Sequence, residues 1–483
     1  MSNRGVLSQT INRCRERGIC IPTFEEMRDP GKIAPAIRRR LPKIGLWDIH
    51  PLNLFRITWK NNVKSGLYGG VNYLEIPRQI TGVKARIVGL LGKFFPTGAH
   101  KVGAAFGCLV PRLVNGEFDP TSQKAVWPST GNFCRGGAFD SALLDCVPVA
   151  ILPEGMSRER FEWLKKIGAE VIATPGTESN VKEIYDKCWE IRRTRSECVI
   201  FNQFEEFGNS VWHYEVTGPA VREAFAEINR NGLNLAAYIS ATGSAGTIAA
   251  GDFLRTVFPR VKVVASEALQ CPTLLLNGFG AHRIEGIGDK HVPWIHNILN
   301  TDAVVAIDDE ACMKILRLMN EPAGRQVLKD SGVPASVVSR LPLLGISGIS
   351  NLLSAIKIAR YFELSERDVI FTIFTDSADL YGSRLDELGQ GLGPYTQKNA
   401  AADHARYLAG AGIDNVQELG YYDRKRLHNL KYFTWVEQQG KTSEELNRLW
   451  DTRFWDTVFR QGPVWDRQIR DFNRSTGMPR RLG

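Results

Sequence analysis

The chain has no closely spaced cysteine pair and few histidines, which limits the metal sites and disulfides it can form. Its nine cysteines include no Cys-x-x-Cys pair, so we expect neither structural zinc nor a disulfide scaffold, and a reducing cytoplasm fits this pattern. Two of the eight histidines, His291 and His296, are close in sequence, but their spacing does not place both on one helix face. We therefore expect no metal ion.

Long apolar stretches are also missing. No run reaches the roughly 18 to 20 apolar residues that a membrane-spanning helix needs. The N-terminus lacks the apolar core of a secretory signal. Both absences predict a cytoplasmic protein with no membrane partner.

A strong excess of one charge is missing as well. The net charge of +9 is modest for 483 residues, and the basic residues are scattered, with the densest groups at 38–40 and 424–426. No nucleic-acid-binding motif accompanies these groups, so we interpret them as solvated or interface residues and expect no nucleic-acid partner. An apolar content of 43% and a charged content of 23% are those of an ordinary globular protein.

The length and the order of the predicted elements indicate more than one domain. Short apolar runs typical of buried strands alternate with helical patterns in two series, which predicts mostly parallel sheets with helices on both faces. The predicted fold class is α/β, with two three-layer parallel-sheet domains, a cleft between them and a mainly helical C-terminal extension. The predicted strands lie at residues 83–91, 125–127, 147–152, 171–173, 199–201, 235–240, 261–266, 303–307 and 369–374.

Composition and the two series set the predicted domain boundaries. A basic, proline-broken arm at 1–45 is expected to pack on the body or on a partner subunit. A smaller α/β domain covers 46–215, although its first part could cross to the other domain, and a larger one covers 216–394. The tryptophan-rich extension at 395–483 is expected to complete a dimer interface or cover the cleft.

A single lysine follows a Pro-Thr-Gly turn at residues 96–98. Lys101 begins a segment whose next residues, 102–105, are small and apolar, which predicts a helix that packs closely on a neighbour. A lysine at the start of such a helix points into a cleft, where its amine has a lowered pKa and can form a Schiff base with an aldehyde cofactor. Taken alone, such a lysine is more often a solvated surface residue.

A glycine-rich turn joins the predicted strand at 235–240 to a helix. Small residues let backbone N–H groups approach an anion, and the helix dipole adds to the attraction, so the turn predicts a phosphate site. It matches neither a Walker loop nor a dinucleotide fingerprint, and a purely structural tight turn is the alternative. The turn consists of Thr242, Gly243, Ser244, Ala245, Gly246 and Thr247.

Four further motifs follow one another between these features: Ser-Thr-Gly-Asn at 129–132, Arg-Gly-Gly-Ala-Phe at 135–139, Leu-Pro-Glu-Gly-Met-Ser at 152–157 and Lys-Lys-Ile-Gly-Ala at 165–169. With them, the region of roughly 60–390 resembles the fold-type II pyridoxal-phosphate enzymes related to cysteine synthase and the tryptophan synthase β chain. The resemblance implies pyridoxal 5'-phosphate as cofactor. The residues around Lys101 are more similar to the tryptophan synthase version.

The resemblance also implies a role for each motif at the cofactor. Lys101 would bind it covalently, the turn at 242–247 its phosphate and Asn132 its ring oxygen, while the loop at Gly286 would cover its face. The alternative for Asn132 is a buried asparagine that caps its own turn.

The substrate carboxylate would be bound by the loop formed by Ser129, Thr130 and Gly131, with Gln203 as a second contact. An ordinary helix or loop glutamine is the alternative for Gln203. Phe and Cys at 133–134 replace the small or hydroxyl residues that the family has there, which leaves the identity of the substrate open.

The segment after the predicted strand at 369–374 corresponds to the one that faces the pyridine nitrogen. Asp376 falls where relatives have serine or threonine, and a shift of one residue would put Ser377 there instead. A carboxylate would keep the nitrogen protonated and strengthen the electron sink, whereas a hydroxyl would not. The alternative is that Asp376 only caps the following helix.

These motifs imply a lyase or β-replacement transferase of cysteine metabolism. It would act on a cysteine- or serine-like amino acid through an aminoacrylate intermediate, as a cysteine desulfhydrase or a cysteine synthase-like enzyme. Threonine or serine dehydration is the alternative within the class, and a non-catalytic scaffold or regulatory relative is the alternative outside it. The scaffold would be marked by loss of the lysine or the phosphate turn, and both are present. A homodimer is also expected.

Overall fold

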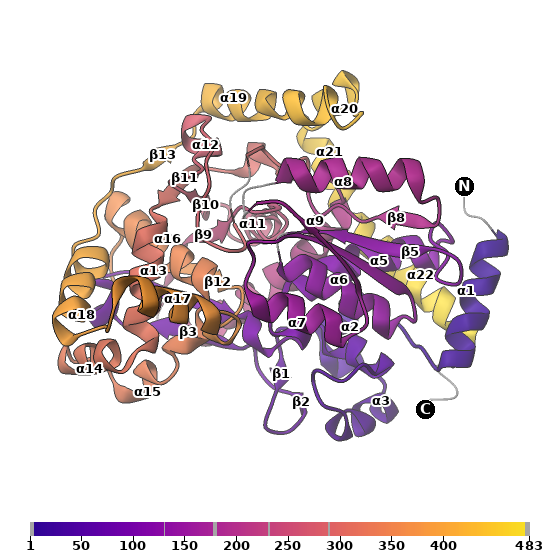
Figure 1. Cartoon of the computed structure of the whole chain (residues 1–483), viewed down its shortest axis with the longest axis horizontal. Coiled ribbons are helices and arrows are strands. Elements are labelled where there is room, and N and C mark those ends of the chain that lie inside the picture. The colour runs from indigo at the N-terminus through magenta and orange to yellow at the C-terminus, as the bar shows by residue number, and fades with distance from the viewer. Residues whose placement is uncertain (1–3, 130, 177–180, 230–231, 288–289, 479–483) are drawn as a thin grey trace.

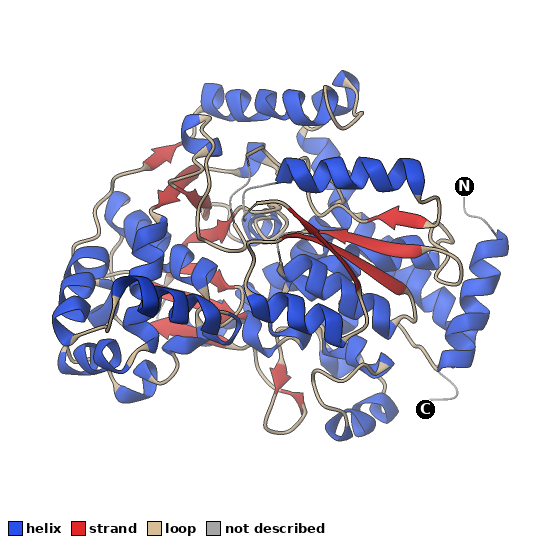
Figure 2. Cartoon of the chain, viewed as in Figure 1, coloured by secondary structure: helices blue, strands red, loops and turns tan. Residues whose placement is uncertain are grey.

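A computed structural model describes the chain except for residues 1–3, 130, 177–180, 230–231, 288–289 and 479–483 (Figure 1). Within the described residues, the strands form a seven-stranded sheet, a four-stranded sheet and a short two-stranded ribbon of β1 (Asn61–Asn62) and β2 (Leu67–Tyr68). Figure 2 shows the two larger sheets enclosed by helices. The predicted α/β fold class is confirmed.

The seven-stranded sheet has the order β13-β11-β10-β9-β12-β4-β3. Its five central strands are parallel, and each edge strand, β3 and β13, pairs antiparallel with its neighbour. Neither edge strand was predicted from the sequence. The strands are β3 (Tyr73–Ile76), β4 (Arg86–Leu91), β9 (Asn234–Ala241), β10 (Lys262–Ala268), β11 (Ala303–Ile307), β12 (Asp368–Phe374) and β13 (Val416–Glu418).

Helices cover both faces of this sheet because alternate side chains of each strand point to opposite sides. In β12, Ile370 and Phe374 join the core formed with α13 (Asp309–Asn320) and α16 (Ile346–Tyr361). Val369, Phe371 and Ile373 of the same strand join the core on the other face. That second core contains α10 (Gly218–Ile228) and α11 (Ala249–Val257).

The four-stranded sheet is parallel throughout, in the order β7-β6-β5-β8. Val126 and Val149 pack toward α8 (Val181–Thr194), whereas Trp127 and Leu152 pack toward α6 (Asn132–Leu143). The strands are β5 (Lys124–Pro128), β6 (Val147–Pro153), β7 (Glu170–Thr174) and β8 (Cys198–Ile200).

The N-terminal segment packs on the far end of the chain. It contains α1 (Arg4–Arg17), α2 (Phe24–Arg28) and α3 (Pro35–Arg40), and its main partner is the last helix, α22 (Gln461–Thr476). The backbone amides of Phe24 and Glu25 both donate to the Asp466 carboxylate, at 2.7 and 3.1 Å. Figure 1 shows α1 beside α22 at the right edge of the molecule.

The C-terminal region is helical apart from β13. Its described α-helices are α18 (Gln397–Asp403), α19 (Tyr421–Lys431), α20 (Ser443–Arg448), α21 (Thr452–Phe459) and α22. Lys431, although buried, donates to the carbonyls of Trp294 and His296, at 2.9 and 2.7 Å, which attaches this region to the body. None of the helices in the described part of the chain has the length and apolarity required to span a bilayer.

Candidate active site

Three neighbouring parallel strands of the larger sheet bring Lys101, the turn at 242–247 and Asp376 to one edge of the sheet. β4, β12 and β9 lie side by side, so their carboxyl ends meet at the same edge of the sheet. Lys101 follows β4 in the chain, the turn at 242–247 follows β9, and Asp376 follows β12. Ligands of open α/β sheets bind outside the carboxyl ends of such strands.

Lys101 is the first residue of α5 (Lys101–Val114). The preceding turn has left-handed backbone at Thr97 (φ 67°) and Gly98 (φ 69°), which reverses the chain so that α5 begins at the site. The ammonium group of Lys101 is half-buried and donates to Ser244 Oγ at 2.8 Å. The lysine therefore contacts the glycine-rich turn directly.

Close helix packing keeps Lys101 inside the protein. A Cβ added at Gly103 would lie 2.1 Å from the Trp212 ring, and one at Gly136 would lie 2.7 Å from Val102 Cα. Only glycine permits these approaches, which hold α5 against α9 (Phe207–Trp212) and α6. The narrow cavity at the lysine is lined by Lys101, Ser129, Asn132, Phe133, Gln203, Phe204, Gly243, Ser244, Gly286, Ile287 and Thr375.

The turn at 242–247 is a tight backbone cradle in which two positions, Gly243 and Gly246, have no room for a side chain. Ala245 is left-handed (φ 59°), and a Cβ at Gly243 would lie 2.9 Å from the Gly286 carbonyl oxygen. A Cβ at Gly246 would lie 1.9 Å from Asn209 Oδ1, while Asn209 Nδ2 donates to Ser244 Oγ at 3.0 Å. This backbone, placed before α11 and beside an ammonium group, fits a phosphate.

Two buried histidines lie behind this turn, and the sequence analysis did not identify them. The Thr247 hydroxyl lies 3.1 Å from His100 Nε2 and 3.4 Å from His213 Nε2. Burial lowers the pKa of His100 to about 3 and that of His213 well below its usual value, so both rings are neutral. The histidine before Lys101 was the only signal in the sequence, and His213 lies more than a hundred residues away from it.

The predicted substrate loop also lies at the site. Ser129 follows β5, and its hydroxyl accepts from the Gly131 amide at 3.2 Å and from Gln203 Nε2 at 3.1 Å. The structure thus brings Gln203 to this loop although 74 positions separate it from Ser129. Thr130, which was predicted to belong to the same loop, lies outside the described residues.

Asn132 and Asp376 are hydrogen-bonded to each other. Asn132 Nδ2 donates to Asp376 Oδ2 at 2.6 Å, and the Tyr381 hydroxyl donates to the same oxygen at 2.8 Å. Asn132 Oδ1 and the other carboxylate oxygen of Asp376, Oδ1, are both buried and have no hydrogen-bond partner within the part of the chain that is described. Burial raises the pKa of Asp376, and Arg160 and the two hydrogen bonds oppose that rise.

Ser377, and not Asp376, is the cap residue of the short 3-10 helix at Ala378–Leu380, and its side chain makes no capping hydrogen bond. The interpretation of Asp376 as a simple helix cap is therefore wrong. Neither residue lines the narrow cavity at Lys101; Asp376 reaches it through Asn132.

A buried network of charged side chains is connected to Asp376 through the Tyr381 hydroxyl. Arg160, in α7 (Arg158–Lys166), donates to the Tyr381 hydroxyl at 3.2 Å and pairs with Glu285 at 3.1 Å. Glu285 also accepts from Arg384 at 2.7 Å. Arg160 and Glu285 were missed by the sequence analysis, because an Arg on one helix and a Glu before a distant loop give no sign that they meet.

The described residues contain no group of three or more His, Cys, Asp or Glu that could hold a metal ion. The residues that are brought together instead fit an organic phosphate with a polar ring. They offer an amine, a backbone cradle, and two unpartnered buried oxygens that could accept from or pair with ring substituents.

Comparisons with known proteins identify the family. The model of the family described as "pyridoxal-phosphate dependent enzyme" matches residues 65–342, more than half of the chain. A probable cysteine synthase of Bacillus subtilis is 31% identical over 240 residues, which are 50% of this chain and 76% of that protein. A cystathionine beta-synthase of Saccharomyces cerevisiae is 26% identical over 391 residues, 79% of this chain and 73% of that protein.

A solved structure has the same fold. The O-acetylserine dependent cystathionine beta-synthase from Helicobacter pylori aligns with a TM-score of 0.54 and 23% identity, over 65% of this chain and 95% of that one. The family match covers the lysine turn, the glycine-rich turn and the loop at 129–132. The chain belongs to the pyridoxal-phosphate dependent enzymes, and its cofactor is pyridoxal 5'-phosphate.

Proposed function

We propose that this enzyme catalyses β-elimination or β-replacement on a cysteine- or serine-like amino acid, with sulfur as the leaving or entering atom. The observation that carries the proposal is the 2.8 Å contact between the Lys101 amine and Ser244 in the glycine-rich turn. It puts the only ammonium group among the residues lining the narrow cavity beside a backbone that fits a phosphate. The likeness to cysteine synthases supports sulfur chemistry.

In this proposal, the backbone of residues 242–247 would bind the cofactor phosphate and Asn132 would contact the ring. The carboxylate of Asp376 would keep the ring nitrogen protonated. When bound, the cofactor withdraws electrons from the α-carbon of the substrate amino acid. Lys101 would hold the cofactor, and its amine, when free, would remove the α-proton of the substrate.

The loop at Ser129 and Gln203 would bind and orient the substrate carboxylate. Phe133, Phe204 and Ile287 line the same cavity and would exclude water from the reacting carbons. With cysteine alone, elimination consumes one water and releases sulfide, pyruvate and ammonia in equal amounts.

The proposal is tested by supplying the loaded enzyme with a panel of amino acids. We expect equal sulfide, pyruvate and ammonia from L-cysteine, or cysteine from O-acetylserine and sulfide. Release of 2-oxobutyrate and ammonia from threonine, with no turnover of cysteine or O-acetylserine, would replace this proposal by an ammonia-lyase function. We also propose a cytoplasmic homodimer, on the family likeness alone; sedimentation of the purified protein tests the dimer.

A further inference from the structure

A buried irregular segment, residues 291–297, lies between the C-terminal extension and the Lys101 site. Within the described chain these residues belong to no helix or strand, yet all of them are buried. Buried backbone groups outside regular structure need hydrogen-bond partners from other parts of the chain. The partners of this segment therefore fix its position.

One edge of the segment is hydrogen-bonded to the extension. The carbonyls of three alternate residues, Val292, Trp294 and His296, accept from side chains of the extension. The indole N–H of Trp435 donates to the first at 2.9 Å, and the ammonium group of Lys431 donates to the other two at 2.9 and 2.7 Å. Both donors are buried. Loss of either would leave a buried carbonyl without its partner, which is costly.

The other edge of the segment contacts the Lys101 site. The Ile295 amide donates to the Phe204 carbonyl at 3.2 Å. The rings of His291 and Phe204 meet edge to face, with centroids 5.0 Å apart. Phe204 and its neighbour Gln203 line the narrow cavity, where Gln203 Nε2 donates to Ser129 Oγ at 3.1 Å. The segment thus holds the backbone and the ring that adjoin the predicted carboxylate contact.

The extension also reaches this part of the site more directly. The Trp435 ring lies 5.6 Å from the His291 ring, so the aromatic contacts run without a break from Trp435 to Phe204. The amide of Lys441 donates to the Trp435 carbonyl at 2.9 Å, and its ammonium group pairs with Glu205 at 3.3 Å. Two parts of the extension therefore hold the stretch of chain that contains Gln203.

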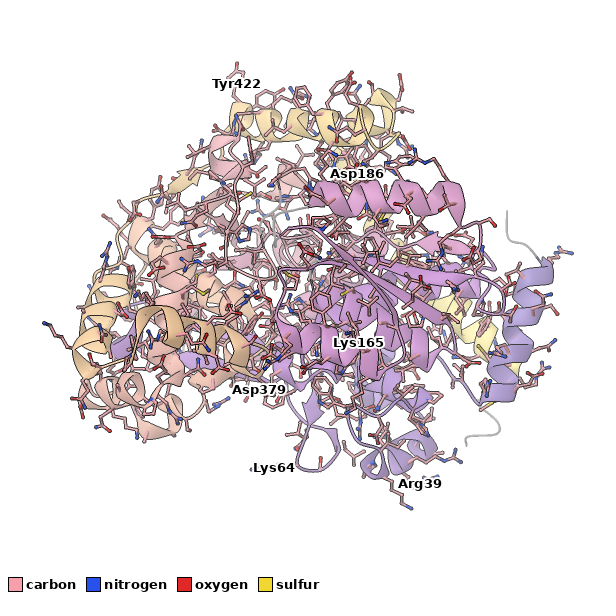
Figure 3. All side chains as sticks on the ribbon, in the orientation of Figure 1. Arg39, Lys64, Lys165, Asp186, Asp379 and Tyr422 are labelled. Atoms are coloured by element: carbon pink, nitrogen blue, oxygen red, sulfur yellow. The ribbon has the colours of Figure 1, made fainter. Side chains whose placement is uncertain are left out.

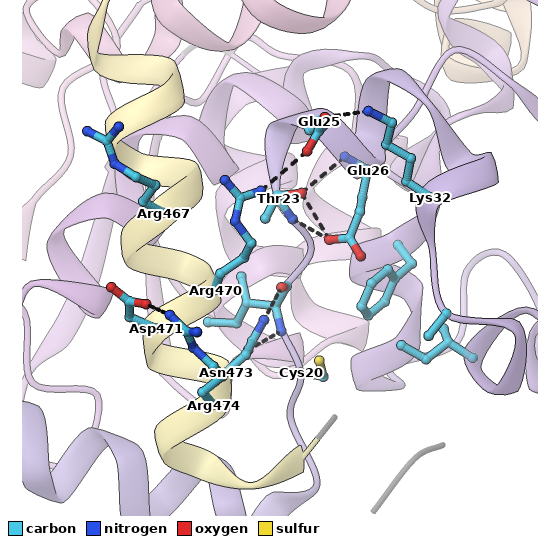
Figure 4. Close-up of a pocket in the computed structure, with 14 residues that line it drawn as sticks. Cys20, Thr23, Glu25, Glu26, Lys32, Arg467, Arg470, Asp471, Asn473 and Arg474 are labelled. Atoms are coloured by element: carbon cyan, nitrogen blue, oxygen red, sulfur yellow. Dashed lines mark hydrogen bonds and ion pairs between the residues drawn. The ribbon is translucent and has the colours of Figure 1, made fainter. Parts of the chain in front are cut away.

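The extension is itself held in place at its last helix. Figure 4 shows α22 against the N-terminal segment, with Arg470 3.3 Å from Glu25. Asn473 of α22 exchanges two hydrogen bonds with the backbone of Ile21, at 3.0 and 2.7 Å. The family model matches residues 65–342, so it covers the buried segment and not the extension.

We propose that Lys431 and Trp435 are positioning residues for the binding of the substrate carboxylate. They would act through the buried segment on Phe204 and Gln203, and so keep the Gln203 amide directed at Ser129. The inference rests on the proposed function, since it takes an α-amino acid as the substrate. The phosphate cradle makes no contact with Lys431 or Trp435 in the described structure, so cofactor binding should not depend on them.

The test titrates the pyridoxal-phosphate-loaded enzyme with L-cysteine, O-acetyl-L-serine and L-threonine, and follows the cofactor absorbance. W435F keeps an aromatic ring and removes the indole N–H. For the amino acid that the unaltered enzyme accepts, W435F should raise the half-saturating concentration and KM about tenfold. It should leave kcat within about twofold, and cofactor affinity in equilibrium dialysis unchanged. K431M removes two donors and should have a larger effect; W435F decides the question where K431M does not fold.

A double-mutant cycle separates positioning from general stabilisation. In Q203A the contact that Trp435 positions is already lost. Q203A/W435F should therefore bind the amino acid no more than about twofold more weakly than Q203A does.

W450F and Y422F are the matched controls within the extension. The Trp450 ring contacts Tyr421 and His428, with centroids 5.9 and 5.0 Å away. Tyr422 is exposed, and Figure 3 shows it pointing away from the molecule. Both variants should bind the amino acid as the unaltered enzyme does.

Three results would overturn the inference and leave the proposed function in place. They are an equal half-saturating concentration for W435F and the unaltered enzyme, a loss of kcat or cofactor affinity as large as the rise in KM, and an undiminished effect of W435F in the Q203A background. An unaltered enzyme that binds none of the three amino acids would overturn the proposed function, and this inference with it.

Discussion

The amide of Asn132 donates a 2.6 Å hydrogen bond to the carboxylate of Asp376, which lies 244 positions later in the chain. This bond links the loop after β5 of the smaller sheet to the segment after β12 of the larger one. It brings together the two residues predicted to contact the cofactor ring. The predictions below concern these residues and their surroundings.

Asp376 is expected to act mainly on proton removal. Its carboxylate would stabilise a protonated ring most strongly when charge develops at the α-carbon, an effect on the order of 2–4 kcal/mol. D376A should therefore slow exchange of the substrate α-proton for deuterium roughly 30- to 1000-fold while cofactor binding changes little. D376S should recover part of the rate. If S377A causes the loss and D376A does not, Ser377 is the ring residue.

Lys101 is expected to be essential for the covalent bond to the cofactor. K101A should fold and lose the absorbance at roughly 410 to 420 nm that a lysine linked to pyridoxal phosphate gives. K84A, at an exposed lysine, should keep it. A K101A protein that remains yellow after borohydride treatment and dialysis would exclude this lysine.

Arg160 is expected to stabilise the ionised form of Asp376. The pKa of Asp376 is raised in the folded protein, so the folded state binds this proton more tightly than the unfolded state does. Protonation of Asp376 therefore stabilises the fold at low pH, and this stabilisation is lost as the pH rises through the folded pKa. R160Q should raise that pKa further and lower the free energy of unfolding by about 3–5 kcal/mol at a pH where Asp376 is ionised, but by less at a lower pH where it is protonated. Urea unfolding at both pH values measures the difference, and R160Q/D376N should regain part of it. An equal loss at both pH values would contradict the pairing.

Gly246 is expected to be required for cofactor retention. A Cβ there would collide with Asn209, which holds Ser244 in the cradle. G246A should weaken cofactor affinity about tenfold or more, measured by equilibrium dialysis. G389A is the control, since nothing surrounds a Cβ at that helical position. Unchanged affinity of G246A would remove this turn from the site.

Buried neutral histidines predict a loss of stability in acid. Burial lowers the pKa of His100, His291 and His296 to about 3. Below about pH 6.5 the unfolded chain binds protons at these rings and the folded chain does not. The free energy of unfolding therefore falls as the pH is lowered, by up to about 1.4 kcal/mol per pH unit for each ring. Urea unfolding between pH 7.5 and 5 measures the slope. H291Q should show a slope smaller by one proton; an unchanged slope would mean that His291 is charged in the fold.

The sequence by itself determined the local elements and the motifs. Apolar runs predicted all central strands of both sheets, because a strand buried on two faces has a recognisable composition. The glycine-rich turn and the lysine turn could be identified because their chemistry depends on backbone shape and one side chain, both of which are local. The edge strands β3 and β13 were missed, since a short edge strand is half-solvated and lacks the apolar signal.

Only the tertiary structure decided which distant residues meet. Asp376 could not be assigned as cap or ring residue from its neighbours in sequence, and its contact with Asn132 depends on how the two sheets face each other. Arg160 contacts Glu285 and Tyr381, and His100 contacts His213 behind the glycine-rich turn. These contacts form because buried polar groups need partners, which here come from distant parts of the chain. Long-range pairing of this kind follows from packing geometry, which a single sequence does not display.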